Sequence, residues 1–200
     1  MRVKKREQPN FPQNAVLSAL KSNLMIIVHC TDVKELTQKS YDEMTDSLHL
    51  ELMKCPFCHH VGFYVNSYYE RSVDNGEDSF RLLVKQIICP ECGKTHAILP
   101  DTIIPYSKYT IHVVHAIVTG DMHAQIIQNV PQDTIRWIIA MFCRKWKERL
   151  LTESIPLEGS PVSISEQCIK AFNMQFMQIH CGKLIYHCPD HIAQSRGSPV

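Results

Sequence analysis

The pattern of hydrophobic and polar positions changes its period several times along the chain. Residues 24–30, "LMIIVHC", form a short apolar run with β-branched residues at its centre, which predicts a buried strand. Residues 41–53 carry apolar side chains at roughly helical spacing, with Asp42 and Glu43 early, where the helix dipole favours acids. The first part of the chain therefore predicts one strand followed by one helix.

The next stretch has an alternating pattern. In residues 79–88, "SFRLLVKQII", the side chains of Phe80, Leu82 and Val84 fall on one face of an extended chain. Residues 63–69, "FYVNSYY", are rich in aromatic side chains, and "DNGED" separates the two stretches. Because Asn-Gly is a strong turn signal, these stretches predict a β-hairpin.

Helical periodicity dominates the rest of the chain. Residues 107–120 predict a helix, although their β-branched side chains leave a strand as an alternative, and residues 121–129 predict a short second helix. Residues 131–151 have the clearest helical pattern, and residues 152–178 predict a linker up to about 165 and then a last helix. One apolar stripe runs along residues 131–151: Ile135, Ile138, Ile139, Phe142, Trp146 and Leu150.

The tryptophans and two cysteines of this region are expected to be buried. Trp137 and Trp146 are interpreted as core residues rather than as base-stacking residues. Cys143 and Cys168 are interpreted as small buried side chains.

Composition narrows the setting of the protein. The chain has 200 residues, a net charge of +1 and ordinary apolar and charged fractions, so overall charge indicates no partner. The basic start "MRVKKRE" is not followed by the apolar segment of a signal peptide, and no apolar run is long enough to cross a bilayer. We therefore expect a cytoplasmic protein without a membrane partner, whose nine cysteines stay reduced.

Two Cys-Pro-x-Cys motifs flank the predicted hairpin. They place Cys55 and Cys58 before it and Cys89 and Cys92 after it, with thirty residues between the pairs. Zinc takes four ligands in a tetrahedron, and each Cys-x-x-Cys turn presents two sulfurs to one ion. The hairpin brings the second pair beside the first, so the pattern predicts one structural zinc ion in a zinc ribbon. Four protein ligands leave no open position, which argues against a catalytic metal.

Several alternatives stay open at this point. His59, His60 or His96 could replace one of the sulfurs, and the cysteines could instead be buried or redox-active thiols. Gly93, after the second pair, suits a left-handed turn, and His59 takes the same place after the first. In the C-terminal tail, Cys181, Cys188 and His191 could bind a second metal ion, although only one close pair has ligand spacing.

The motifs also resemble a known family. "CPFC", the hairpin, "CPECGKTHAILPDTIIPYSKYT" and "TIRWIIAMF" resemble an uncharacterised bacterial family of zinc-ribbon proteins that occur with insertion sequences and other mobile elements. The layout is similar to the N-terminal zinc ribbon and helix-turn-helix of certain insertion-sequence transposases. The resemblance covers about residues 24–150. Its most specific part is matched by Cys89, Cys92, Thr95, His96, Leu99, Pro100, Pro105 and Tyr106. It implies a setting in transposition or recombination, with a transposase or recombinase as a possible partner.

A DNA-binding role is predicted from residues 107–151. Three helices there would form a helix-turn-helix, in which the start of the third helix faces the major groove. Residues 131–151 hold five basic and two acidic side chains, a local net charge of +3. The predicted base contacts are Gln132, Asp133, Thr134 and Arg136, and the predicted phosphate contacts are Arg144, Lys145 and Lys147. The alternative is an ordinary amphipathic helix with a solvated basic end.

These elements predict an α+β protein with four parts. They are a basic flexible arm (residues 1–23), a zinc-ribbon domain with an N-terminal strand and helix (24–106), a helix-turn-helix-like region (107–151), and a linker, helix and Cys/His-containing tail (152–200). The predicted function is a non-catalytic, zinc-stabilised DNA-binding protein, accessory or regulatory to a mobile element. The rival is a zinc-ribbon module that meets a partner protein through Tyr64, Tyr68 and Tyr69. The chain shows no motif typical of an enzyme, and too few residues follow 151 for a nuclease core.

Overall fold

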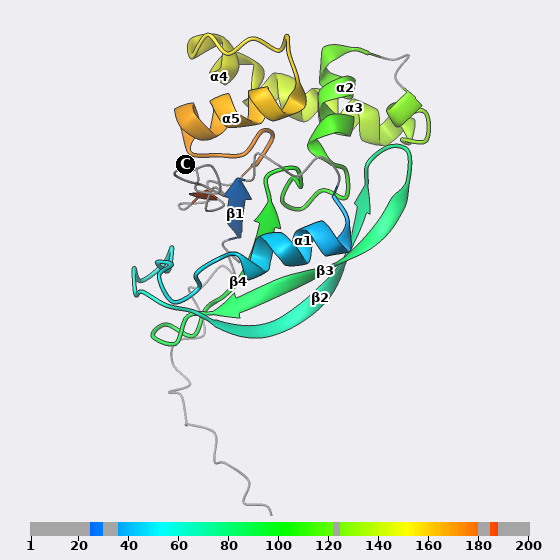
Figure 1. Ribbon diagram of the computed structural model, residues 1–200. Helices are drawn as coiled ribbons and strands as arrows, with labels where there is room; N and C mark the ends of the chain where they lie inside the picture. The colour runs from blue at the N-terminus through cyan, green and yellow to red at the C-terminus, as the bar shows by residue number, and fades with distance from the viewer. Residues whose placement is uncertain (1–24, 30–35, 122–124, 180–184, 188–200) are drawn as a thin grey trace, which may run out of the picture.

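The computed structural model describes residues 25–29, 36–121, 125–179 and 185–187, and combines a β-sheet with several helices (Figure 1). The strands are β1 (Ile26–His29), β2 (Tyr64–Asp74), β3 (Ser79–Ile88), β4 (Thr95–Pro100) and β5 (Ile185–His187). The helices are α1 (Gln38–Asp46), α2 (Ile111–Thr119), the 3-10 turn η2 (Gln125–Ile127), α3 (Gln132–Lys145), α4 (Lys147–Thr152) and α5 (Pro161–Phe172). The α+β class predicted from the sequence is confirmed. The division of the chain into domains stays a prediction.

The five strands form one sheet in the order β2-β3-β4-β1-β5. Strands β2 and β3 are an antiparallel hairpin, β4 is antiparallel to β3, and β1 lies parallel to both β4 and β5. The residues of β1 are all buried, as expected for a strand between two parallel neighbours. The hairpin turns at Asn75, whose side chain accepts hydrogen bonds from the N–H groups of Glu77 and Asp78.

Helix α1 closes an open part of the sheet. Strand β3 pairs with β4 only over residues 86–88, so its earlier backbone groups need other partners. The Gln38 amide accepts from the Leu83 N–H at 2.8 Å and donates to the Leu83 carbonyl at 3.3 Å. The buried Tyr41 hydroxyl accepts from the Lys85 N–H at 2.8 Å and donates to the Ile98 carbonyl at 2.9 Å. Helix α1 therefore supplies hydrogen bonds that a neighbouring strand would otherwise make.

Helices α2 to α5 gather at one end of the molecule, beyond the end of β1 (Figure 1). Their buried side chains form one cluster from Ile104 to Met177, and a second cluster, from Ile26 to Ile103, lies between the sheet and α1. Trp146 is buried in the helical cluster and packs edge-on against Phe172 and Phe176. At Trp146, where φ is −116°, α3 ends and α4 begins at the next residue.

Several predicted helix boundaries are wrong. The helix expected over residues 41–53 is α1, which begins at Gln38 behind a Thr37 capping box and ends at Asp46. The long helix expected over 131–151 is broken at Trp146. The last helix begins at Pro161 rather than near 165, because Ser160 caps it and proline suits the first helical position.

The short second helix expected over residues 121–129 is only the single turn η2 within the part of the chain that is described. By contrast, residues 107–120 form a helix rather than a strand, although this helix, α2, begins only at Ile111. Gly120 ends it in a left-handed conformation at φ 76°.

The predicted burial of Trp137 and Cys143 is wrong, because both side chains are exposed. Successive residues of a helix are about 100° apart, so Trp137 lies about 200° from Ile135 and falls off the apolar stripe. Trp146 and Cys168 are buried as predicted.

None of the helices in the described ranges has both the length and the apolar character of a bilayer span. The basic arm and the tail residues Cys181, Cys188 and His191 lie outside the described residues.

Candidate metal centre

The two Cys-Pro-x-Cys turns have closely similar backbones. We call residues 55–60 the first knuckle and residues 89–94 the second. In the first, Cys55 N–H donates to the His60 carbonyl at 2.8 Å, and its own carbonyl accepts from His59. In the second, Cys89 N–H donates to the Lys94 carbonyl at 3.0 Å, and its own carbonyl accepts from Gly93. Matching hydrogen bonds give both turns the same shape, with the two cysteines of each on one side.

The residue after each second cysteine has a left-handed backbone. Gly93 has φ 65° and His59 has φ 62°, so the two knuckles agree although their sequences differ here. The sequence predicts this conformation at both positions. Glycine adopts it without a steric penalty, and histidine is among the residues that tolerate it best.

Strands β2 and β3 bring the knuckles together, because β2 starts just after the first and β3 ends just before the second. Both loops lie at the end of the hairpin opposite its tip (Figure 1). The Cys55 and Cys92 sulfurs are 3.7 Å apart, the Cys58 and Cys89 sulfurs are 3.5 Å apart, and all four lie within 4.8 Å of one another. These four cysteines are free thiols, so the group can hold one metal ion.

The sulfur spacing fits a tetrahedral thiolate site. A tetrahedron with metal–sulfur bonds of about 2.3 Å has sulfur–sulfur edges of about 3.8 Å. The two pairs that lie across the knuckles come within a few tenths of an ångström of this value. Both of these contacts join cysteines of different knuckles, so an ion at the centre would link the two ends of the hairpin.

The four cysteines of the cluster are buried or partly buried. Cys55 and Cys89 are fully buried. Burial raises the pKa of the Cys92 thiol to about 12. At Cys89 burial opposes ionisation as well, but hydrogen bonds from the N–H groups of Cys92 and Glu91 and with the Cys58 and Cys92 side chains together lower the pKa. A bound cation would add the positive charge that four thiolates need, two of which are fully buried.

Two contacts around the cluster were not predicted from the sequence. The His96 Nε2 atom lies 3.7 Å from the Cys55 sulfur, and the buried ring packs edge-on against Phe63. His96 therefore stands beside the four sulfurs rather than replacing one of them. The Lys94 ammonium lies 3.3 Å above the centre of the Phe57 ring and joins the second knuckle to the first. The sequence signal was only the nearness of each residue to a cysteine.

The residues predicted to contact DNA lie elsewhere, on the helical part. Gln132, Asp133 and Arg136 are exposed in the first turns of α3, and Thr134 is partly buried. Arg136 forms an exposed ion pair with Asp133 at 3.3 Å. The phosphate-contact candidates are also exposed: Arg144 and Lys145 end α3, and Lys147 begins α4.

Part of the chain matches the model of a protein family. A family model described as a domain of unknown function (DUF6431) matches residues 55–137. The matched stretch begins at the first metal-site cysteine and includes both knuckles, the hairpin, α2 and the first turns of α3. No curated protein and no solved structure matches the chain.

Proposed function

We propose that the four-cysteine cluster binds one structural zinc ion and that the protein is a non-catalytic, zinc-stabilised DNA-binding protein. The sulfur geometry carries the metal part of this proposal, because four thiols at tetrahedral spacing suit zinc and leave no open position for a substrate. In this proposal residues 55–92 are a zinc ribbon. The ion contributes to folding by holding the ends of the hairpin together.

The metal proposal predicts about one zinc equivalent per purified chain. A Cys89→Ser, Cys92→Ser double variant should lose the ion and unfold the region around the knuckles. Cys143→Ser is a matched control, because that thiol is exposed and outside the cluster. Metal analysis by mass spectrometry measures both variants. Retention of a full equivalent by the double variant would show that these cysteines are not the ligands.

The DNA part of the proposal rests on the exposed surface of α3. The predicted base-contact residues lie at the start of a helix, where a recognition helix meets base edges. Arg144, Lys145 and Lys147 extend the same region with basic side chains. Helices α2 and α3 share one buried cluster, which would hold α3 in place. Residues 120–131, which connect them, are more than a three- or four-residue turn, so this helix-turn-helix would be an extended variant.

A binding series on a duplex selected from random sequences tests the DNA proposal. Arg136→Ala should weaken binding by about 1–3 kcal/mol and relax sequence preference. Arg81→Ala is the matched control, because Arg81 is also exposed and paired with a carboxylate, but lies on β3. If both variants bind the selected and scrambled duplexes like the wild type, α3 does not recognise DNA.

The residues predicted to contact DNA phosphates should behave differently in the same binding series. Changing Lys145 or Lys147 to alanine should weaken binding to all duplexes about equally and reduce its dependence on salt. Lys170 is exposed on α5, so Lys170→Ala should change neither the affinity for DNA nor its dependence on salt. The proposed accessory role beside a transposase or recombinase rests on the resemblance of the motifs alone. Co-purification of a tagged chain with such an enzyme would test it.

A protein partner is the second candidate function, and one observation favours it. Tyr64 and Tyr68 are exposed on β2, which is an edge strand of the sheet, whereas Tyr69 is partly buried. Exposed tyrosines are common anchors of protein interfaces. Tyr64→Ser combined with Tyr68→Ser should abolish binding of such a partner and leave DNA affinity unchanged. Partner binding that is insensitive to salt, together with no DNA binding, would favour this candidate.

A further inference from the structure

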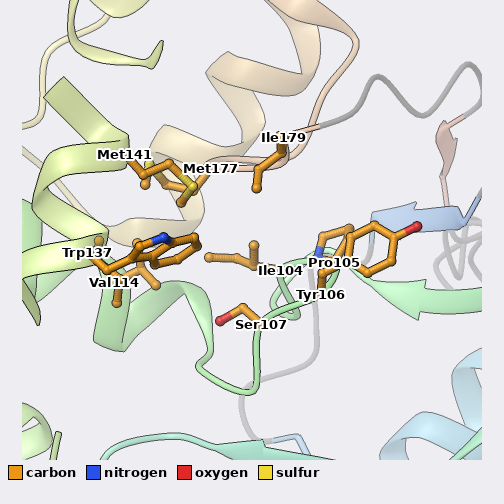
Figure 2. Close-up of a pocket in the computed structure, with 10 residues that line it drawn as sticks. Ile104, Pro105, Tyr106, Ser107, Val114, Trp137, Met141, Met177 and Ile179 are labelled. Atoms are coloured by element: carbon orange, nitrogen blue, oxygen red, sulfur yellow. The ribbon is translucent and has the colours of Figure 1, made fainter. Parts of the chain in front are cut away.

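An apolar cavity of about 160 Å³ lies away from the metal centre, between the 104–107 loop, α2, α3 and residues 177–179 (Figure 2). No residue that lines it is charged. An apolar cavity of about 150 Å³ is large enough to take up benzene. The cavity therefore has room for one aromatic ring.

The loop on one side of the cavity is held in place from a distance. The Arg71 guanidinium on β2 donates to the Ile104 carbonyl at 2.9 Å and to the Ser107 carbonyl at 2.7 Å. Between them, Tyr106 has a left-handed backbone with φ 64°. Large side chains rarely adopt this conformation, and it persists only where the surrounding structure imposes it.

The segment on the opposite side is fixed in a similar way. Gln175 is fully buried, and its side-chain amide donates to the Asp101 carbonyl at 2.6 Å. Its backbone N–H donates to the Gln178 side chain at 3.0 Å. Met177, within this turn, also has a left-handed backbone, with φ 62°. Two lining residues, Tyr106 and Met177, thus have unfavourable backbone conformations beside polar contacts of Arg71 and Gln175. Such strain is common at binding sites that exist before the ligand arrives.

The lining favours an uncharged aromatic ligand. The half-exposed Trp137 indole offers an aromatic surface, and Met141 and Met177 offer thioether sulfurs, which make favourable contacts with rings. Figure 2 shows Trp137 and Met177 facing Pro105 and Tyr106 across Ile104. The Ser107 hydroxyl is already used, because it accepts from the Tyr109 N–H and donates to the Tyr109 carbonyl.

We propose that this cavity binds a small uncharged molecule with a single aromatic ring, and that Trp137 is its main contact. The inference is independent of the proposed DNA binding. The probe is fluorobenzene, observed by its ¹⁹F signal in the presence of the full-length, zinc-bound protein. We expect the protein to broaden the ¹⁹F signal of fluorobenzene in a saturable way. Toluene should reverse this broadening, whereas the charged analogue benzoate should not.

Variants separate this site from general surface binding. Trp137→Ala should weaken fluorobenzene binding at least tenfold, since it removes the aromatic wall. Leu151→Ala is the matched control, because Leu151 is an exposed apolar residue on α4 outside the cavity, and it should bind like the wild type. Val114→Phe should block binding by filling the space, whereas Ile139→Phe, on α3 outside the cavity, should not.

Three results would overturn the proposal. Unchanged binding by Trp137→Ala would show that the ring binds elsewhere. Equal competition by benzoate and toluene would show that charge is not excluded. Displacement of fluorobenzene by a short phenylalanine-containing peptide with at least tenfold higher affinity than toluene would identify a protein side chain as the occupant instead. Trp137 is exposed, so its replacement tests the site even if Val114→Phe does not fold.

Discussion

The Tyr41 hydroxyl joins β3 and β4 at the point where they separate, so its removal should destabilise the sheet. The ring is buried, and the hydroxyl bonds to both the Lys85 N–H and the Ile98 carbonyl. Burial raises the pKa of this phenol, which therefore keeps the proton that it donates. In Tyr41→Phe the Lys85 N–H loses this partner inside the protein. A buried donor left unsatisfied costs about 1–3 kcal/mol, so we expect a loss of about 2 kcal/mol.

Urea unfolding followed by circular dichroism, with zinc present, measures this loss. For a denaturant slope of about 2 kcal/mol per molar urea, a loss of about 2 kcal/mol lowers the unfolding midpoint by about 1 M. Tyr68→Phe is the matched control, because Tyr68 is half exposed, and its change should stay below about 0.5 kcal/mol. If the two variants unfold at the same urea concentration, the hydroxyl of Tyr41 does not stabilise the sheet.

Two more substitutions test other parts of the fold. Gly76→Ala should lower the free energy of unfolding by more than about 2 kcal/mol in the same assay, because Gly76 has φ 92° and an added Cβ would lie 2.1 Å from the Ile126 carbonyl oxygen. Gly159→Ala should lower it by less, because Gly159 also has a positive φ but has open space around it. A hydrogen bond to Asp101 raises the pKa of His29 above 6.5. The protonated His29 therefore stabilises the folded protein fully below about pH 6.5, and this stabilisation is lost as the pH rises through the folded-state pKa. Stability should therefore fall less between about pH 6 and about pH 9 in His29→Gln than in the wild type, and an equal fall in both would contradict this role.

The sequence predicted those features that depend on neighbouring residues. The cysteine spacing, the Asn-Gly turn and the alternation in residues 79–88 are local, and the structure brings the four sulfurs together around that hairpin. The left-handed turns after Cys58 and Cys92 were predicted for the same reason. The conformation of a short turn is set mainly by the residues within it.

Features that depend on distant contacts could not be predicted in this way. The helical pattern of residues 131–151 is interrupted at Trp146, whose ring packs against Phe172 and Phe176, which come much later in the chain. The cavity beside Trp137 is likewise built by four separate segments. Trp137 itself was assigned to the core from its residue type, although its angular position on α3 already placed it off the apolar stripe.

The contact between Gln38 and Leu83 has a consequence for self-association. A strand whose backbone groups lack partners can add a strand from another molecule, which is a common route to aggregation. On β3 the Gln38 amide occupies both backbone groups of Leu83, and the side chain of Leu83 is itself exposed and apolar. Helix α1 therefore prevents this part of β3 from pairing with a strand of another chain. Conditions that detach this short helix while the remaining strands stay paired would expose the backbone of Leu83 as a template for intermolecular sheets.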